Sequence, residues 1–443
     1  MHAVKRLCLL RRFSTAASAR LQSTKNTMSQ SSTQPANAGW EGHEEKLEDY
    51  DPGSIKGYCP VVPGDVLGSY RIFRKLGWGG YSTVWLAESQ GSLSNPDLSA
   101  LKLMTSVATK EQERLCELEF LQRIRDQSSV HPGYAHVLQM KDNFYHQGPH
   151  GQHLCIVTEP LFHNMHRFSL RFPHRIMPLR LVRSISRQIV LGLQYLHDEC
   201  NIIYTDIKPD NVLMIAPNGQ NFFRDNYAEL HNPLETSIVT SPTGAAITLT
   251  CSDPIYYPLP TVLSTEDDIW LRLKVKISDL GVACWADKVS QHHTECIQST
   301  ALRAPEVAIG AGWGKPADIW SLGCTIYELY MGRPLIPADV DELLVAPLHG
   351  ILFGQYPEAL VKRGKHSHFF FNPDGSFKET GTWSPFDSEI RRRNAPDAEH
   401  FIDFLRLTFE LDPDRRATCG DLLAHPWLDP ENWDTFRSRK TQG

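Results

Sequence analysis

The chain of 443 residues lacks a long hydrophobic run, since no apolar stretch approaches the roughly 18 residues that a transmembrane helix requires. We therefore expect no membrane association. The ten cysteines include no Cys-x-x-Cys pair and no dense cluster, which argues against a structural zinc site and favours reduced thiols in an intracellular compartment. The net charge of −6 is mildly negative and gives no general attraction to nucleic acid, which is itself negatively charged, so we expect no direct nucleic-acid binding.

Acidic residues are absent before Glu41, whereas Ser, Ala and basic residues are frequent there. The basic residues are Lys5, Arg6, Arg11, Arg12, Arg20 and Lys25. This composition in residues 1–40 resembles a mitochondrial presequence. The alternatives are a disordered basic leader and translation from Met28. Residues 41–57 contain few large apolar groups and indicate a linker.

Regular periodicity is missing between about residues 215 and 270, where Asn, Pro, Ser, Thr and Gly are frequent. A structureless stretch of this length is uncommon inside a compact domain unless it is an insertion. We therefore predict an insertion at about 215–270 that is largely mobile.

Three polar residues stand out in Ile202–Leu213, which reads Ile-Ile-Tyr-Thr-Asp-Ile-Lys-Pro-Asp-Asn-Val-Leu. Asp206 supplies a carboxylate that can accept a hydroxyl proton, Lys208 a cation for a phosphoryl group, and Asn211 a metal-binding amide. The apolar pairs on either side predict two short buried strands that fix the loop. A polar turn between two strands is the alternative if this loop is considered alone.

A glycine-rich turn is predicted at Leu76–Trp85, between a strand at 70–75 and a second apolar strand. Gly77 and Gly79 would let backbone amides approach a triphosphate, and Val84 would cover an adenine ring. Ser82 stands where a third glycine is usual, so a hairpin without a ligand remains the alternative.

A single lysine, Lys102, lies in the short apolar strand at 100–103. A buried lysine is costly unless it meets an anion, and phosphates plus a helix carboxylate would meet this need. The spacing of Leu115, Leu118, Leu121 and Ile124 predicts a helix over 110–125. We choose Glu117 as the partner carboxylate and keep Glu119 as the alternative.

The remaining chemistry-bearing residues follow predicted strands and helices. A buried strand at 154–158 leads into Glu159 and Leu161, where we predict a hinge whose backbone would meet adenine. A helix over 179–197 leads into the loop at 202–213, the predicted catalytic loop. A strand at 275–277 ends in Asp279-Leu280-Gly281, a second metal carboxylate site. Farther along come Ala304-Pro305-Glu306, Asp318 at the start of a helix, and Arg416. Glu306 and Arg416 are predicted to form a buried ion pair.

In this order the motifs resemble those of eukaryotic protein kinases, from about residue 58 to 430. Within that family the chain is most similar to the SR-protein kinases (SRPK), in particular to fungal members. The motifs that carry this resemblance are Tyr58-x-Pro-Val, Lys75-Leu-Gly-Trp-Gly, Thr205-Asp206-Ile207-Lys208-Pro209, Asp279-Leu280-Gly281 with Ala283-Cys284-Trp285, and Gly364-Lys365-His366-Ser367 with Phe370-Phe371-Asn372.

The resemblance implies an α+β, bilobal fold. A β-rich N-lobe and hinge would occupy 58–161, a mainly helical C-lobe 162–430, and a tail 431–443. It also implies Mg·ATP as cosubstrate: Asp206 accepts the substrate's proton, Lys208 steadies the γ-phosphate, and Asn211 and Asp279 hold Mg²⁺. The residues implied to bind ATP are Gly77, Gly79, Ser82, Val84, Lys102, Glu117, Glu159 and Leu161. Ser299, or its neighbour Thr300, would position the peptide, and Glu306, Asp318 and Arg416 are structural.

The expected activity is phosphorylation of Ser or Thr in Arg/Ser-rich proteins, by a monomer in cytoplasm and nucleus, or in mitochondria if residues 1–27 act as a presequence. Tyr204-Thr205 replaces the usual His-Arg. The missing Arg predicts activity without activation-loop phosphorylation, and Tyr204 is expected to loosen the core.

Ala304-Pro305-Glu306 stands where SRPK members typically have Ser-Leu-Glu, which allows a substrate specificity less strict than that for the Arg-Ser dipeptide. A pseudokinase scaffold is the second function considered. Asp339, Asp341 and Glu342 form an acidic cluster that either docks a basic substrate tail or is simply a solvated helix start.

Overall fold

The computed structural model describes residues 57–90, 97–240, 244, 246–256, 272–288, 294–378 and 384–430. The expected leader at 1–40, the linker up to residue 56 and the tail at 431–443 lie outside the described residues. Within the described ranges, every helix is too short or too polar to traverse a lipid bilayer.

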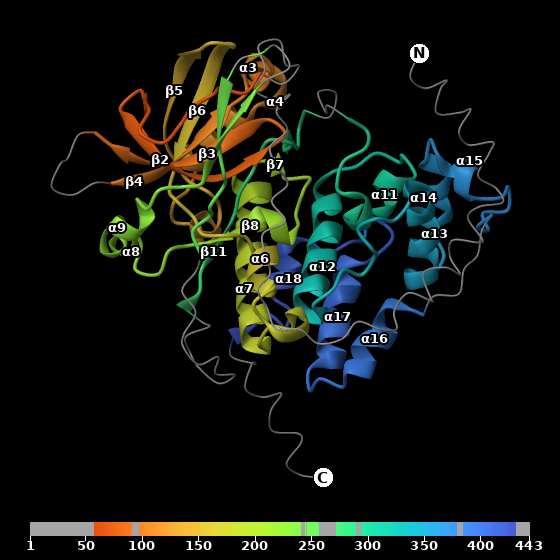
Figure 1. Cartoon of the computed structure of the whole chain (residues 1–443). Coiled ribbons are helices and arrows are strands. Elements are labelled where there is room, and N and C mark those ends of the chain that lie inside the picture. Colours follow the sequence, from red (N-terminus) through yellow and green to blue (C-terminus); the bar gives the residue numbers. More distant parts are fainter. Residues whose placement is uncertain are drawn as a thin grey trace. The chain divides into compact units, whose positions relative to one another are not determined.

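A six-stranded antiparallel sheet forms the N-terminal part of the fold, in the order β1-β2-β3-β4-β6-β5 (Figure 1). The strands are β1 (Val66–Leu67), β2 (Tyr70–Gly79), β3 (Ser82–Ser89), β4 (Leu98–Met104), β5 (Met140–Gly148) and β6 (Gly151–Thr158). The predicted strands at 70–75, 100–103 and 154–158 are confirmed. Residues 80 and 81 connect β2 to β3, so the glycine-rich turn joins two long paired strands.

The helix predicted over 110–125 is wrong as one continuous element. The structure has α3 (Ser106–Lys110), α4 (Gln112–Leu115) and α5 (Glu117–Asp126). Cys116 ends α4 in the left-handed conformation with φ 55°, and this sharp change of direction places Glu117 in the first turn of α5. Phe120, Leu121 and Ile124 form the buried face of α5.

Helices dominate the C-terminal part (Figure 1). They are α6 (Met165–Ser169), α7 (Leu179–Gln194), α11 (Pro305–Ala308), α12 (Lys315–Met331), α13 (Glu342–Phe353), α14 (Glu358–Arg363), α15 (Ser367–Phe370), α16 (Phe386–Arg393), α17 (Ala398–Thr408) and α18 (Cys419–Leu423). Helix α12 contacts both α7 and α17 and is buried along most of its length. Because it is apolar on nearly every face, α12 forms the centre of this core.

The segment that we expected to lack regular structure contains several short elements. They are α8 (Gln220–Asp225), α9 (Tyr227–Leu230) and a hairpin of β9 (Thr236–Thr240) with β10 (Ala246–Thr250). The expectation of a structureless stretch is therefore wrong over these residues. Residues 257–271 lie outside the described residues.

Candidate active site

Two short strand pairs hold the predicted catalytic loop. Strand β7 (Ile202–Ile203) pairs with β12 (Cys284–Trp285), and β8 (Val212–Met214) pairs with β11 (Val275–Ile277). The two predicted flanking strands are thus confirmed. Since β11 leads to Asp279 and β8 follows Asn211, this pairing brings two candidate metal ligands together.

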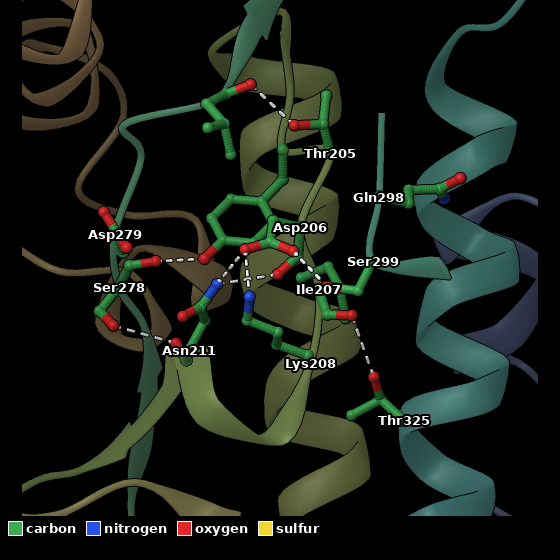
Figure 2. Close-up of polar contacts among 12 residues, drawn as sticks. Thr205, Asp206, Ile207, Lys208, Asn211, Ser278, Asp279, Gln298, Ser299 and Thr325 are labelled. Carbon is green, nitrogen blue, oxygen red and sulfur yellow. Dashed lines mark hydrogen bonds and ion pairs between the residues drawn. The ribbon is translucent and has the colours of Figure 1, made fainter. Parts of the chain in front are cut away.

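Asp206 lies at the centre of the polar contacts drawn in Figure 2. Its Oδ2 lies 2.7 Å from Lys208 Nζ and accepts a hydrogen bond of 2.9 Å from Asn211 Nδ2. Its Oδ1 accepts a bond of 3.4 Å from the Ser299 hydroxyl. The structure therefore brings all three loop residues and Ser299 together, although they come from two distant parts of the sequence.

Asp318 holds the backbone just before the catalytic aspartate. Its buried carboxylate accepts the N–H groups of Tyr204 and Thr205, each at 2.7 Å, and lies 2.8 Å from His197 Nε2. Thr205 has φ 69°, a strained conformation for a β-branched residue. The Thr205 hydroxyl also donates to the Val282 carbonyl at 2.7 Å. These bonds stabilise a backbone turn that aims Asp206.

Tyr204 does not leave the core loose, contrary to our expectation. Its side chain is completely buried, and its hydroxyl donates to the Ser278 carbonyl. Ser278 in turn donates its backbone N–H and its hydroxyl to the Asn211 carbonyl, at 2.9 and 3.0 Å. The tyrosine therefore links the catalytic loop to Ser278, the residue that precedes Asp279.

Lys102 meets two carboxylates. Its Nζ lies 2.6 Å from Glu117 Oε1 and 3.1 Å from Asp279 Oδ1, so the predicted choice of Glu117 gives the expected contact. Burial favours a lower pKa for Lys102, but the charges of Asp279 and Glu117 outweigh burial and raise that pKa. Lys102 lowers the pKa of Asp279, whereas burial raises the pKa of Glu117. A cation is thus held at the base of the site.

The glycine-rich hairpin lies beside this lysine, because β3 and β4 place Val84 opposite Lys102. A Cβ added to Gly77 or Gly79 would meet no atom within 4 Å. The space next to these two glycines is therefore open, as a backbone that contacts phosphate requires. Ser82 is buried at the start of β3.

The predicted hinge follows β6 directly. Leu161 is buried, and the Glu159 side chain pairs with Lys276 in β11 and accepts the Gln139 N–H at 3.3 Å. The carboxylate of Glu159 therefore faces β11, which leaves its backbone as the part that could contact a nucleotide.

Glu306 and Arg416 form the predicted buried ion pair. Arg416 Nη1 and Nη2 donate to the two Glu306 oxygens at 2.8 and 2.9 Å. Arg416 Nη1 also donates to the Pro316 carbonyl, and its Nε donates to the Glu410 carbonyl. With both side chains almost fully buried, this pair fastens α11 to the start of α12 and to the loop before α18.

The acidic cluster has structural roles. The Asp341 side chain caps α13 by accepting the Leu343 N–H at 2.9 Å, and Glu342 lies 3.5 Å from Arg303. The helix-start alternative thus accounts for Asp341, while docking at the cluster remains a prediction.

One acidic pair was missed by the sequence analysis. Glu328 lies near the end of α12, where burial and the nearby charge of Asp210 raise its pKa to about 7. Asp210 belongs to the catalytic loop, between Lys208 and Asn211. A glutamate within the apolar last turns of the helix was the available signal, because a buried carboxylate is costly unless charges or hydrogen bonds compensate for burial.

Comparison with known proteins agrees with this geometry. The protein kinase domain family matches residues 70–223 and 262–428. The serine/threonine-protein kinase SRPK of Physarum polycephalum is 33% identical, over 88% of this chain and 92% of its own. Protein kinase dsk1 of Schizosaccharomyces pombe is 30% identical, over 90% of this chain and 87% of its own. Mouse SRSF protein kinase 3 is 28% identical, over 87% of this chain and 91% of its own.

A solved structure supports the fold. A crystal structure of a kinase domain superimposes with a TM-score of 0.60 at 20% identity, over 84% of this chain and 99% of that one. The chain therefore has the bilobal protein kinase fold, and it belongs to the protein kinase family and, within it, to the SRPK serine/threonine kinases.

Proposed function

We propose that this kinase transfers the γ-phosphoryl group of Mg·ATP to serine or threonine in Arg/Ser-rich protein segments. The observation that carries the substrate class is the pair of carboxylates, Asp210 and Glu328, beside the catalytic loop. Burial and the charge of Asp210 raise the Glu328 pKa to about 7, whereas the charge of Arg175 lowers it. His166 Nδ1 lies 3.9 Å from Glu328 Oε1. The two carboxylates therefore favour positive charge beside them. An arginine side chain of the substrate would supply that charge and bind in a bidentate manner.

The residues present fit Mg·ATP. Asn211 uses its Nδ2 to bond Asp206, which leaves its amide oxygen for a metal, and Asp279 supplies a carboxylate. Oxygen donors of this kind suit Mg²⁺. Gly77 and Gly79 leave open space for phosphates, and Lys102 supplies a cation. When bound, Mg²⁺ would neutralise charge on the phosphates, while Asp206 orients the acceptor hydroxyl and takes its proton.

The test compares ATP-dependent ³²P transfer to Arg-Ser, Lys-Ser and Ala-Ser repeat peptides. We expect strong labelling of the Arg-Ser set alone, and a higher KM for that set in Glu328→Gln. The Ala-Ser peptide serves as the matched control, because it cannot use the carboxylate pair. Equal labelling of all three sets would contradict the arginine specificity.

We further propose that the kinase acts as a monomer in cytoplasm and nucleus, with a mitochondrial location as the alternative. The basic composition of the first forty residues motivates that alternative. Fluorescent fusions with and without residues 1–27 test it, and the same diffuse distribution for both would contradict a presequence.

A further inference from the structure

The segment between the hinge and the catalytic loop is strongly basic. From residue 160 to residue 197 the sequence contains arginines and histidines but no Asp or Glu. One of these arginines, Arg183, pairs with Asp397 in the core. Any carboxylate that balances a cation of this segment therefore comes from another element of the fold.

Two basic side chains of this segment face Glu328, near the end of α12. His166 Nδ1 of α6 lies 3.9 Å from Glu328 Oε1, and α6 contacts the short helix Pro209–Asn211 in the catalytic loop. The second is Arg175. Burial and the charge of Asp210 raise the pKa of Glu328, whereas the charge of Arg175 lowers it. The charge of Arg175 thus reaches the carboxylate pair.

The turn that carries Arg175 is strained. His174 and Arg175 have φ angles of 53° and 59°, which residues other than glycine adopt rarely and which persist only where the surroundings impose them. Phe172 and Met177 are buried on either side of the turn, and the Arg175 N–H donates to the Phe172 carbonyl at 2.9 Å. Packing of the flanking side chains therefore fixes the backbone from which Arg175 projects.

This turn lies directly against the end of α12. Gly332 ends the helix with φ 74°, and its N–H donates to the Glu328 carbonyl at 2.8 Å. A Cβ added to Gly332 would lie 2.4 Å from the His174 carbonyl oxygen, so only a glycine allows this close approach. The strained turn thus packs on the helical turn that begins at Glu328.

We propose that Arg175 is a specificity-determining residue that weakens the binding of a substrate cation at the pair of Asp210 and Glu328. The inference rests on the proposed function, in which this pair binds a substrate arginine. A guanidinium held beside the pair repels a second guanidinium that enters it. Arg175 therefore sets how strongly basic peptides are preferred over neutral ones, and weaker binding favours release of the peptide after one phosphoryl transfer.

The test uses Arg175→Lys, Arg175→Gln and Arg175→Glu in the full chain, a series that changes the charge beside the pair in single steps. Arg125→Gln and Arg125→Glu are the matched controls, because Arg125 is 42% exposed and pairs with the adjacent Asp126 in α5. They change the net charge equally, away from the carboxylate pair. His174→Asn keeps Arg175 and suits the left-handed backbone, so it reports on disturbance of the turn alone.

The measurement is kcat and KM for Arg-Ser and Ala-Ser repeat peptides at about pH 8.5, above the Glu328 pKa of about 7. We expect Arg175→Lys to keep the KM for Arg-Ser within about twofold and Arg175→Gln to lower it about fivefold. Arg175→Glu should lower it about fivefold further, as for one unit charge a few ångströms away in surroundings open to water. The effect should appear in KM rather than in kcat, because substrate and transition state bind the pair alike. The KM for Ala-Ser should not follow the series.

Two outcomes would overturn the role of Arg175. In the first, the three Arg175 variants have the same KM for Arg-Ser although Glu328→Gln raises that KM. In the second, the Arg125 variants or His174→Asn lower the KM as much as the Arg175 variants do, which would indicate an effect of net charge or of the turn. If Glu328→Gln leaves the KM for Arg-Ser unchanged, the proposed arginine site itself is refuted, and the role of Arg175 with it.

Discussion

Asp318→Asn is the substitution that tests most directly how α12 aims the catalytic loop. The carboxylate accepts three hydrogen bonds, two through Oδ2 and one through Oδ1. An amide has only one acceptor oxygen, so its NH₂ group must face either the Thr205 N–H or the two donors at Oδ2. At least one buried donor is left without an acceptor.

The magnitude follows from these contacts. An unsatisfied buried donor at a formerly charged acceptor costs about 1.5–3 kcal/mol of unfolding free energy. Thr205, at φ 69°, stores about 1–3 kcal/mol of backbone strain, which the lost bond allows to relax. Relaxation moves Asp206, and a displacement of about 1 Å costs roughly 100-fold in rate. We therefore expect kcat to fall about 100-fold while the KM for ATP changes little.

Steady-state phosphotransfer and urea unfolding measure these two quantities. Asp421→Asn is a matched control, because Asp421 also accepts a backbone N–H, that of Thr418 at 2.8 Å, but at the start of α18. The control should lose about 1 kcal/mol of stability and keep its kcat. A kcat for Asp318→Asn close to that of the unsubstituted protein would refute the reasoning.

Three further substitutions or conditions have defined outcomes. Arg416→Met should lower the free energy of unfolding by about 3–5 kcal/mol, because it leaves the buried charge of Glu306 without its partner. Adding Glu306→Leu should recover part of this loss in urea unfolding, and additive losses would contradict a coupled pair. Tyr204→Phe removes the hydrogen bond to the Ser278 carbonyl and should raise the Mg²⁺ concentration that gives half-maximal kcat. Tyr204→His tests whether another donor at this position restores the Mg²⁺ dependence. An unchanged Mg²⁺ dependence in Tyr204→Phe would show that the bond does not position Asp279. Because the Glu328 pKa is about 7, the carboxylate ionises as pH rises from 6 to 8, so the KM for Arg-Ser peptides should fall over that range while the KM for Ala-Ser peptides stays constant.

The same pKa fixes the sign of a stability effect. Burial raises the Glu328 pKa from its model-peptide value of 4.5 to about 7, so the folded state binds more protons than the unfolded state between these values. The contribution of this group to stability is therefore greatest below pH 4.5 and is lost as pH rises through 7.

Local patterns predicted much of the site. The strands around the catalytic loop and the strand before Asp279 are short apolar runs that end in polar residues. Such runs predict strands from the local sequence alone. The ion pair between Glu306 and Arg416 was predicted from the residue types in two short motifs, Ala304-Pro305-Glu306 and the Asp-Pro-Asp-Arg-Arg run at 412–416.

The rest depends on contacts between distant residues. The left-handed conformation at Cys116 occurs without a glycine, which is the usual sequence signal for such a turn. The helix predicted over 110–125 therefore continued through this break. The elements α8, α9, β9 and β10 are short, and they are stabilised by contacts with distant residues, such as that of Arg74 with the Leu230 carbonyl at the end of α9, rather than by periodicity of their own. Asp210 and Glu328 lie on different elements, so only the fold brings their charges together.

Transfer of ³²P from ATP to a generic basic protein tests the central claim most directly. The unsubstituted protein is compared with Asp206→Ala and with Asp279→Ala. An active kinase that uses the geometry described above should label the substrate, and either substitution should reduce labelling at least about 1,000-fold, because a transition-state contact is lost. Labelling that survives both substitutions, or is absent from the unsubstituted protein, would contradict the account and favour a binding scaffold.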